Sequence, residues 1–202
     1  HILSRLPSLI PEVDSVTVSD IPLTDINLPA FPGGYPPPPG QAMVFPYHTT
    51  MFIQFYNKGI SLRPFRATGG AKNLINNLFE DNVITITLRN TKHQPTRNSN
   101  LDEWYKVYQE LKNSKFRPIV IPCFEDYMGD RLFANYDWEI FAPAVLDNDL
   151  RLALYEKALD NLCINNGSQT LLIHSDCRYK YFKWLTEGVD IASAEHHKKT
   201  FD

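Results

Sequence analysis

From residue 82 onward, short apolar strands alternate with helical segments, and this alternation constrains the fold more than any other feature of the sequence. A strand can be followed by a parallel strand only through a crossover connection, which is usually a helix. We therefore expect a three-layer α/β fold with a parallel sheet. The expected elements are strand 83–88, helix 101–111, strand 117–121, helix 147–162, strand 170–173 and a helix over 178–185.

The first part of the chain has a different composition. Most of the fifteen prolines lie in the first fifty residues, and segment 31–40 reads FPGGYPPPPG. Such a segment favours extended backbone and predicts a surface loop or linker, although a docking segment for an aromatic groove is an alternative. We expect residues 1–80 to hold the end of a preceding domain, this irregular proline-rich linker and short helices, one of them near 71–79. Residues 81–202 are expected to form a Rossmann-like domain.

Composition limits the classes of function. Hydrophobic residues make up 43% of the chain, which is enough for a substantial core. The formal net charge of -3 argues against a nucleic-acid partner bound through bulk charge. No apolar run approaches the roughly 20 residues of a membrane helix, so no transmembrane segment is expected. The three cysteines are far apart, which predicts reduced thiols in a cytoplasmic protein. The first residue, His1, is not Met, and we therefore expect a missing N-terminal domain that contacts this chain.

Arg89 is the first candidate site residue. It follows the apolar strand 83–88 directly, and ligands of open α/β sheets bind beyond the carboxyl ends of the strands. A guanidinium group in this place can hold a diphosphate through paired hydrogen bonds, and as a catalytic residue it can neutralise the charge that builds on a leaving phosphate. The alternative is an arginine that forms an ion pair with a nearby carboxylate.

Arg97 is the second candidate, at the start of helix 101–111. A positive charge at a helix N-terminus is unfavourable unless an anion compensates it, which predicts a bound anion. Asn98 and Ser99 follow, and we expect them in the same phosphate-binding loop. Capping of the helix by Ser99 or Asn100 would by itself account for these small polar residues.

Two further groups are expected at the same edge of the sheet. Asn166, Gly167 and Ser168 precede the expected strand 170–173, and their backbone N–H groups and hydroxyl could face a phosphate or a sugar. The alternative is an Asn-Gly pair that ends a helix in the left-handed conformation. Asp126, with Glu125 beside it, follows strand 117–121 and could accept hydrogen bonds from a ribose or a base; solvated loop acids are the alternative.

Histidine supplies the candidate general base, because its pKa lies near neutrality. His48 lies in an aromatic segment and is our candidate catalytic base, although a structural role would also suit it. His93, in the loop between Arg89 and Arg97, is the other candidate. The motifs G-x-G-x-x-G, G-x-x-x-x-G-K-[ST] and G-x-S-x-G are absent from the sequence, which disfavours dinucleotide oxidoreductases, P-loop enzymes and α/β-hydrolases.

Four segments, together with Trp104, resemble the C-terminal, donor-binding half of GT-B-type glycosyltransferases. They are VITITLR (83–89), PTRNSN (95–100), DLRLALYEKA (149–158) and NNGS (165–168). The likeness covers about residues 82–184 and is nearest to fucosyltransferase-like members and to uncharacterised bacterial relatives encoded with surface-polysaccharide genes. It departs from that family in one respect, because those enzymes have two domains and this chain has room for one complete domain.

The resemblance implies a nucleotide-sugar donor held by this domain and a glycan acceptor held by the other. Arg89 and Arg97 would contact the donor diphosphate, Asn166, Gly167 and Ser168 would line the same pocket, and no metal or other cofactor would be required. Two alternatives stay open at this point. One is a nucleotide-sugar epimerase of the same fold, and the other is a non-catalytic module that binds a nucleotide or a glycan.

Overall fold

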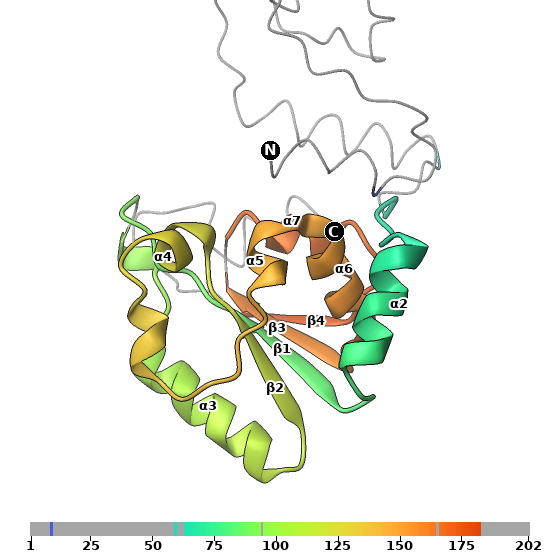
Figure 1. Cartoon of the computed structure of the whole chain (residues 1–202). Coiled ribbons are helices and arrows are strands. Elements are labelled where there is room, and N and C mark those ends of the chain that lie inside the picture. Colours follow the sequence, from blue (N-terminus) through green and yellow to red (C-terminus); the bar gives the residue numbers. More distant parts are fainter. Residues whose placement is uncertain (1–8, 10–58, 60–62, 94, 165, 183–202) are drawn as a thin grey trace, which may run out of the picture. The chain divides into compact units, whose positions relative to one another are not determined.

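The computed structural model describes residues 9, 59, 63–93, 95–164 and 166–182 (Figure 1). The chain forms two compact units, Asp14–Leu62 and the remainder. All helices and strands named below belong to the remainder. The proline-rich segment 31–40 and His48 lie outside the described residues.

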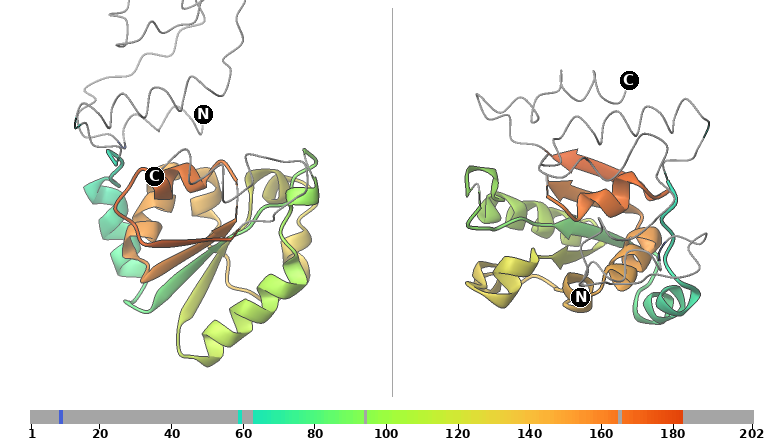
Figure 2. Two further views of the ribbon diagram at one scale, coloured as in Figure 1. Left: turned by 180° about the vertical axis from the view of Figure 1, so that it is seen from behind. Right: turned by 90° about the horizontal axis from the view of Figure 1, so that it is seen from above.

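The centre of the fold is a four-stranded, all-parallel sheet in the order β2-β1-β3-β4 (Figure 2). The strands are β1 (Val83–Thr87), β2 (Arg117–Ile121), β3 (Asp160–Ile164) and β4 (Tyr179–Phe182). Strand β1 is central and is buried at every residue, as its apolar, β-branched sequence VITIT requires. The parallel sheet with helices confirms the expected Rossmann-like α/β fold.

Helices cover both faces of the sheet (Figures 1 and 2). One face carries α3 (Leu101–Asn113), which packs through Tyr108 on Ile84 and Ile86. The other face packs around Val83 and carries α2 (Gly69–Leu78), α5 (Pro143–Leu146), α6 (Asn148–Lys157) and α7 (Gln169–Ile173). Short helices α4 (Phe124–Met128), η3 (Pro95–Arg97) and η4 (Leu132–Asn135) lie in the connections.

The order of elements after residue 147 differs from the expectation. The predicted helix 147–162 ends at Lys157, because Ala158 has extended backbone and the next residues form β3. The predicted strand 170–173 is the helix α7, and within the predicted helix 178–185 the described residues 179–182 form β4. The error at 170–173 arises because a short, buried apolar run fits a strand or a helix equally well.

The outer edge of β2 is covered by residues 139–141. Val120 donates its N–H to the Glu139 carbonyl at 2.8 Å and accepts from the Phe141 N–H at 3.4 Å. Pro118 faces the same way two residues earlier, so its missing N–H costs the sheet no hydrogen bond.

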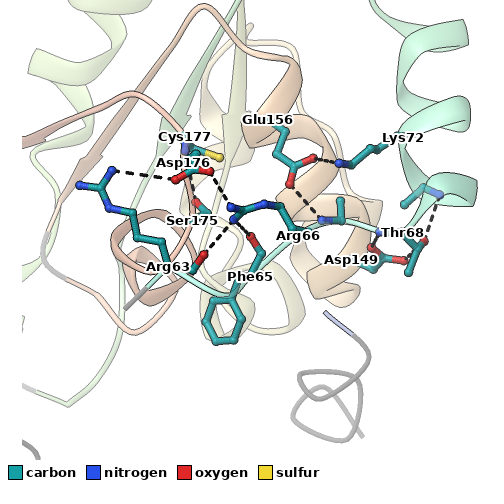
Figure 3. Close-up of polar contacts among 12 residues, drawn as sticks. Arg63, Phe65, Arg66, Thr68, Lys72, Asp149, Glu156, Ser175, Asp176 and Cys177 are labelled. Atoms are coloured by element: carbon teal, nitrogen blue, oxygen red, sulfur yellow. Dashed lines mark hydrogen bonds and ion pairs between the residues drawn. The ribbon is translucent and has the colours of Figure 1, made fainter. Parts of the chain in front are cut away.

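Helix α2 belongs to the same compact unit as the sheet. Its N-cap residue Thr68 is tied to α6 by the Asp149 carboxylate, which accepts from the Thr68 N–H at 2.8 Å and from its hydroxyl at 2.6 Å (Figure 3). Glu156, two turns further along α6, accepts from the Ala67 N–H at 3.0 Å and pairs with Lys72 at 2.8 Å.

Replacing Asp149 with alanine should lower the free energy of unfolding by about 2 kcal/mol, because two charge-assisted hydrogen bonds are lost at a buried residue. Urea denaturation followed by circular dichroism measures the change. Asp149→Asn keeps the shape and one acceptor oxygen, so it should cost less. Equal stability of Asp149→Ala and the parent chain would show that this link does not stabilise the fold.

The buried side-chain amide of Asn161 links β3 to β1, to α6 and to the residue before β4. Asn161 of β3 accepts from the Thr85 hydroxyl of β1 at 2.6 Å. Its amide N–H groups donate to the carbonyls of Tyr155 at 3.0 Å and Arg178 at 2.8 Å. All of the polar atoms of this fully buried side chain therefore have partners, as a buried polar group requires.

The three cysteines are free thiols. Burial raises the pKa of Cys163 to about 12 and that of Cys177 to about 11. It also raises the pKa of Cys123, whose hydrogen bond with Asn90 opposes the rise. Thiols with such values are protonated at neutral pH and are poor nucleophiles.

Candidate functional site

The order in which strands are added to the sheet reverses at β1. The chain passes from β1 through α3 to β2 on one side, and then crosses back to β3 on the other side. The loops that leave β1 and β3 therefore diverge at the carboxyl edge of the sheet, which is where ligands bind in open α/β folds. We refer to this place, with the loop from β1 to α3 and residues 166–168 after β3, as the switch point.

The structure brings Arg89 to the switch point but buries it, with 5% of its surface exposed. Its backbone is fixed to the start of α3, because its N–H donates to the Ser99 hydroxyl at 2.9 Å and its carbonyl accepts from the Ser99 N–H at 2.7 Å. Its guanidinium donates to the Asn98 side-chain oxygen and to the His93 carbonyl, both at 2.5 Å. Arg89 therefore braces the loop in which the other candidates lie.

Arg97 lies beside Arg89 across this loop. Burial, and after it the charge of Arg97, lower the pKa of the Arg89 guanidinium. The charge of Arg97 also acts on Tyr181 of β4, where it opposes the rise of the tyrosine pKa that burial causes. Arg97 therefore acts electrostatically both on Arg89, beyond the end of β1, and on Tyr181 of β4. Two positive charges held close together at a carboxyl edge favour a bound anion.

Asn98 and Ser99 shape the loop. The Asn98 side-chain oxygen also accepts from the Thr91 N–H at 3.0 Å, and its amide donates to the Asn90 side chain and the Thr91 carbonyl, both at 3.0 Å. All hydrogen-bonding capacity of the Asn98 amide is therefore used inside the loop. The N-cap of α3 is Asn100, which accepts from the Glu103 N–H at 3.3 Å, and this settles the open choice between Ser99 and Asn100.

The residues after β3 connect to the end of β1. The Asn166 amide donates to the Leu88 carbonyl at 3.4 Å, and its oxygen accepts from the Ser168 hydroxyl at 2.9 Å and the Gln169 N–H at 3.2 Å. Gly167 is exposed and follows a strand, so it does not end a helix, and its φ is not positive. The structure thus brings this loop to the switch point and gives Asn166 the bridging role.

A hollow of about 260 Å³ lies on the other side of the loop that follows β1. Its floor includes Asp126, whose carboxylate accepts from the Asn90 amide at 2.9 Å and the Leu132 N–H at 3.0 Å. Its wall includes Glu125, which accepts from the Lys92 N–H at 2.8 Å. The lining residues are Asn90, Thr91, Lys92, Pro95, Glu125, Asp126, Gly129, Asp130 and Leu132. Three carboxylates against one lysine make this hollow acidic.

The acidic hollow and the pair Arg89 and Arg97 lie next to each other and carry opposite charges. Asn90, which sequence reasoning missed, is the residue that separates them, since it contacts both Asn98 and Asp126. Its position directly after Arg89 at the end of a strand was the available signal. The exposed His93 contributes its carbonyl to the Arg89 guanidinium. Among the described residues, no cluster of His, Cys, Asp and Glu side chains is arranged to hold a metal ion.

Comparison of the chain with protein-family models, with curated proteins and with solved structures found no match in any of the three. In the described part of the chain, no helix combines the length and the apolar character needed to cross a membrane. A proposal for the function of the domain can therefore be based only on the geometry of the switch point and of the hollow beside it.

Proposed function

We propose that this domain binds the nucleoside diphosphate part of a nucleotide-sugar donor, as the donor-binding half of a GT-B-type glycosyltransferase. One observation carries the proposal. Arg89 and Arg97 lie in one loop beyond the end of β1, at the topological switch point of a parallel sheet, where the charge of Arg97 adds to burial in lowering the pKa of Arg89. A diphosphate is the ligand that such a pair at such a place suits best.

In this proposal the two arginines have different roles, because Arg89 positions the loop and Arg97 contacts the diphosphate. Arg89 is almost fully buried and positions the loop through Asn98 and His93. Arg97 is only half-buried, so its guanidinium is the group that reaches the phosphate oxygens. A bound dianion relieves the repulsion between the two cations, and this relief adds to the binding energy.

The acidic hollow fits the nucleoside end of the same ligand. Its carboxylates repel a phosphate, but they accept hydrogen bonds from ribose hydroxyls or from the N–H groups of a base. Asp126 keeps its position through Asn90 and Leu132, which fixes the acceptor in advance of binding. A ligand with a neutral, donor-rich end and an anionic end matches the change in charge across Asn90.

Glycosyl transfer breaks the bond between the sugar and the diphosphate, and negative charge builds on the leaving phosphate. Arg97 beside the helix N-terminus of α3 can stabilise this charge without a metal. His48, our candidate base, lies outside the described residues.

A thermal-shift screen tests the proposal. The chain is heated with GDP, UDP, CMP or ADP and with the corresponding nucleotide sugars. A ligand at 100 times its dissociation constant stabilises the folded state by about 2.7 kcal/mol, which is a shift of a few degrees for a chain of this size. A shift with one nucleotide class supports the proposal, and product analysis with the donor alone then separates a transferase from an epimerase. No shift with any nucleotide would contradict it.

A further inference from the structure

Two buried groups of opposite charge are joined by a chain of hydrogen bonds at the carboxyl edge of the sheet. Asp126 of α4 is 3% exposed, and Arg89, beyond the end of β1, is 5% exposed. The side-chain amides of Asn90 and Asn98 connect them. Asn90 donates to the Asp126 carboxylate at 2.9 Å and accepts from the Asn98 amide at 3.0 Å. The oxygen of Asn98 in turn accepts from the Arg89 guanidinium at 2.5 Å.

The direction of this chain of hydrogen bonds is fixed by its two ends. An ionised carboxylate can only accept hydrogen bonds, and a guanidinium group can only donate them. Asn90 must therefore turn its NH₂ group toward Asp126, which leaves its oxygen for the NH₂ group of Asn98. The Asn98 oxygen then faces Arg89, and it also accepts from the Thr91 N–H at 3.0 Å. One orientation of both amides satisfies all of these contacts, and the Asp126 carboxylate selects it.

The same hydrogen bonds hold the loop that carries the two candidate anion-binding arginines. Asn98 lies between Arg97 and Ser99 in the sequence, and Ser99 is bonded to both the N–H and the carbonyl of Arg89. The amide of Asn98 also donates to the Thr91 carbonyl at 3.0 Å. A displaced Asn98 side chain would therefore release the Arg89 guanidinium and the backbone next to Arg97 together.

We propose that Asp126 is a positioning residue for the anion that the two arginines bind. It acts through the amides of Asn90 and Asn98 and does not contact the anion itself. The inference rests on the proposed function in taking this anion to be a diphosphate. By its charge alone, a carboxylate near a bound anion would weaken binding. A positioning role and a purely electrostatic role therefore predict opposite effects when the Asp126 side chain is removed.

The test measures the affinity of the chain for inorganic pyrophosphate by titration calorimetry. Asp126→Ala removes the acceptor and should weaken pyrophosphate binding about tenfold, because small displacements of the binding groups are costly. Both hydrogen bonds that Asp126 accepts go to its Oδ1 atom, so Asp126→Asn can keep them while losing the repulsive charge. Its affinity should equal or exceed that of the parent chain. Asn90→Ala breaks the chain of hydrogen bonds but spares the contact between Asp126 and Leu132, and should weaken binding as Asp126→Ala does.

Asp130→Ala is the matched control for charge. Asp130 is an exposed carboxylate of the same hollow and takes no part in the chain of hydrogen bonds from Asp126 to Arg89. Its removal deletes the same negative charge, so it should tighten pyrophosphate binding slightly. A loss of affinity as large as that of Asp126→Ala would show that the effect does not depend on the amides, and would overturn the inference.

Three further results would overturn it. The first is pyrophosphate affinity in Asp126→Ala that equals or exceeds that of the parent chain. The second is a loss in Asp126→Asn as large as in Asp126→Ala, which would assign the effect to charge. The third is the absence of pyrophosphate binding by the parent chain. If Asp126→Ala does not fold, Asn90→Ala decides, and parent-like affinity in that variant also overturns the inference. Binding of pyrophosphate but of no nucleotide would contradict the proposed function and leave the role of Asp126 intact.

Discussion

Replacing Arg97 with methionine should weaken the binding of the nucleoside diphosphate about a hundredfold, which corresponds to about 2.7 kcal/mol. The reason is that Arg97 is the half-buried member of the arginine pair, so its charge is more accessible to the ligand than that of the buried Arg89. The measurement is a calorimetric titration with the nucleotide selected by the thermal-shift screen.

The stability of the variant separates binding from folding. The pKa of Arg89 is lowered by burial and, after it, by repulsion from Arg97, so removing Arg97 relieves part of this strain and the melting temperature without ligand should not fall. Lys106→Met is a suitable control, because Lys106 is exposed on α3, where it pairs with Glu103 at 2.7 Å. Nucleotide affinity that is equal in Arg97→Met and the control would remove Arg97 from the site.

Replacing Asn161 with alanine should lower the free energy of unfolding by about 3 kcal/mol. The change leaves the Thr85 hydroxyl and the carbonyls of Tyr155 and Arg178 without partners, and it opens a cavity between β1 and β3. Urea denaturation at a single pH measures the difference. The large effect is expected because an unpaired polar group in a buried position loses its hydration and gains nothing in return.

Thr85→Val provides the graded comparison for Asn161. It removes only the hydroxyl, leaves the two amide hydrogen bonds of Asn161 intact, and should cost about 1–2 kcal/mol. If Thr85→Val is as destabilising as Asn161→Ala, the carbonyl contacts of the amide do not contribute to stability. Both variants lie away from the switch point and should leave nucleotide affinity unchanged.

The sequence predicted the first strand–helix–strand unit correctly because each of its elements has its own local signal. Strand β1 is short and β-branched, α3 has an Asn cap with acidic residues in its first turn, and β2 is a short apolar run that ends before Pro122. After residue 147 these signals disappear. Helix α6 is buried at six residues and runs into β3 after two connecting residues, so no change of periodicity marks the boundary.

The candidate site was only partly accessible to sequence reasoning. Arg89 and Arg97 could be placed at one edge because a strand end and a helix start fix their positions. The role of Asn98 as the centre of the loop could not be predicted, because its four hydrogen bonds depend on the folded path of the chain.

The covering of β2 has a consequence for how this protein behaves at high concentration. The edge of a sheet can recruit a strand from another molecule when it offers unpaired N–H groups. On the outer edge of β2, Pro118 has no N–H and the N–H of Val120 is already bonded to Glu139. Self-association into extended intermolecular sheets is therefore blocked at β2 by two neighbouring features, a proline and a short return of the chain.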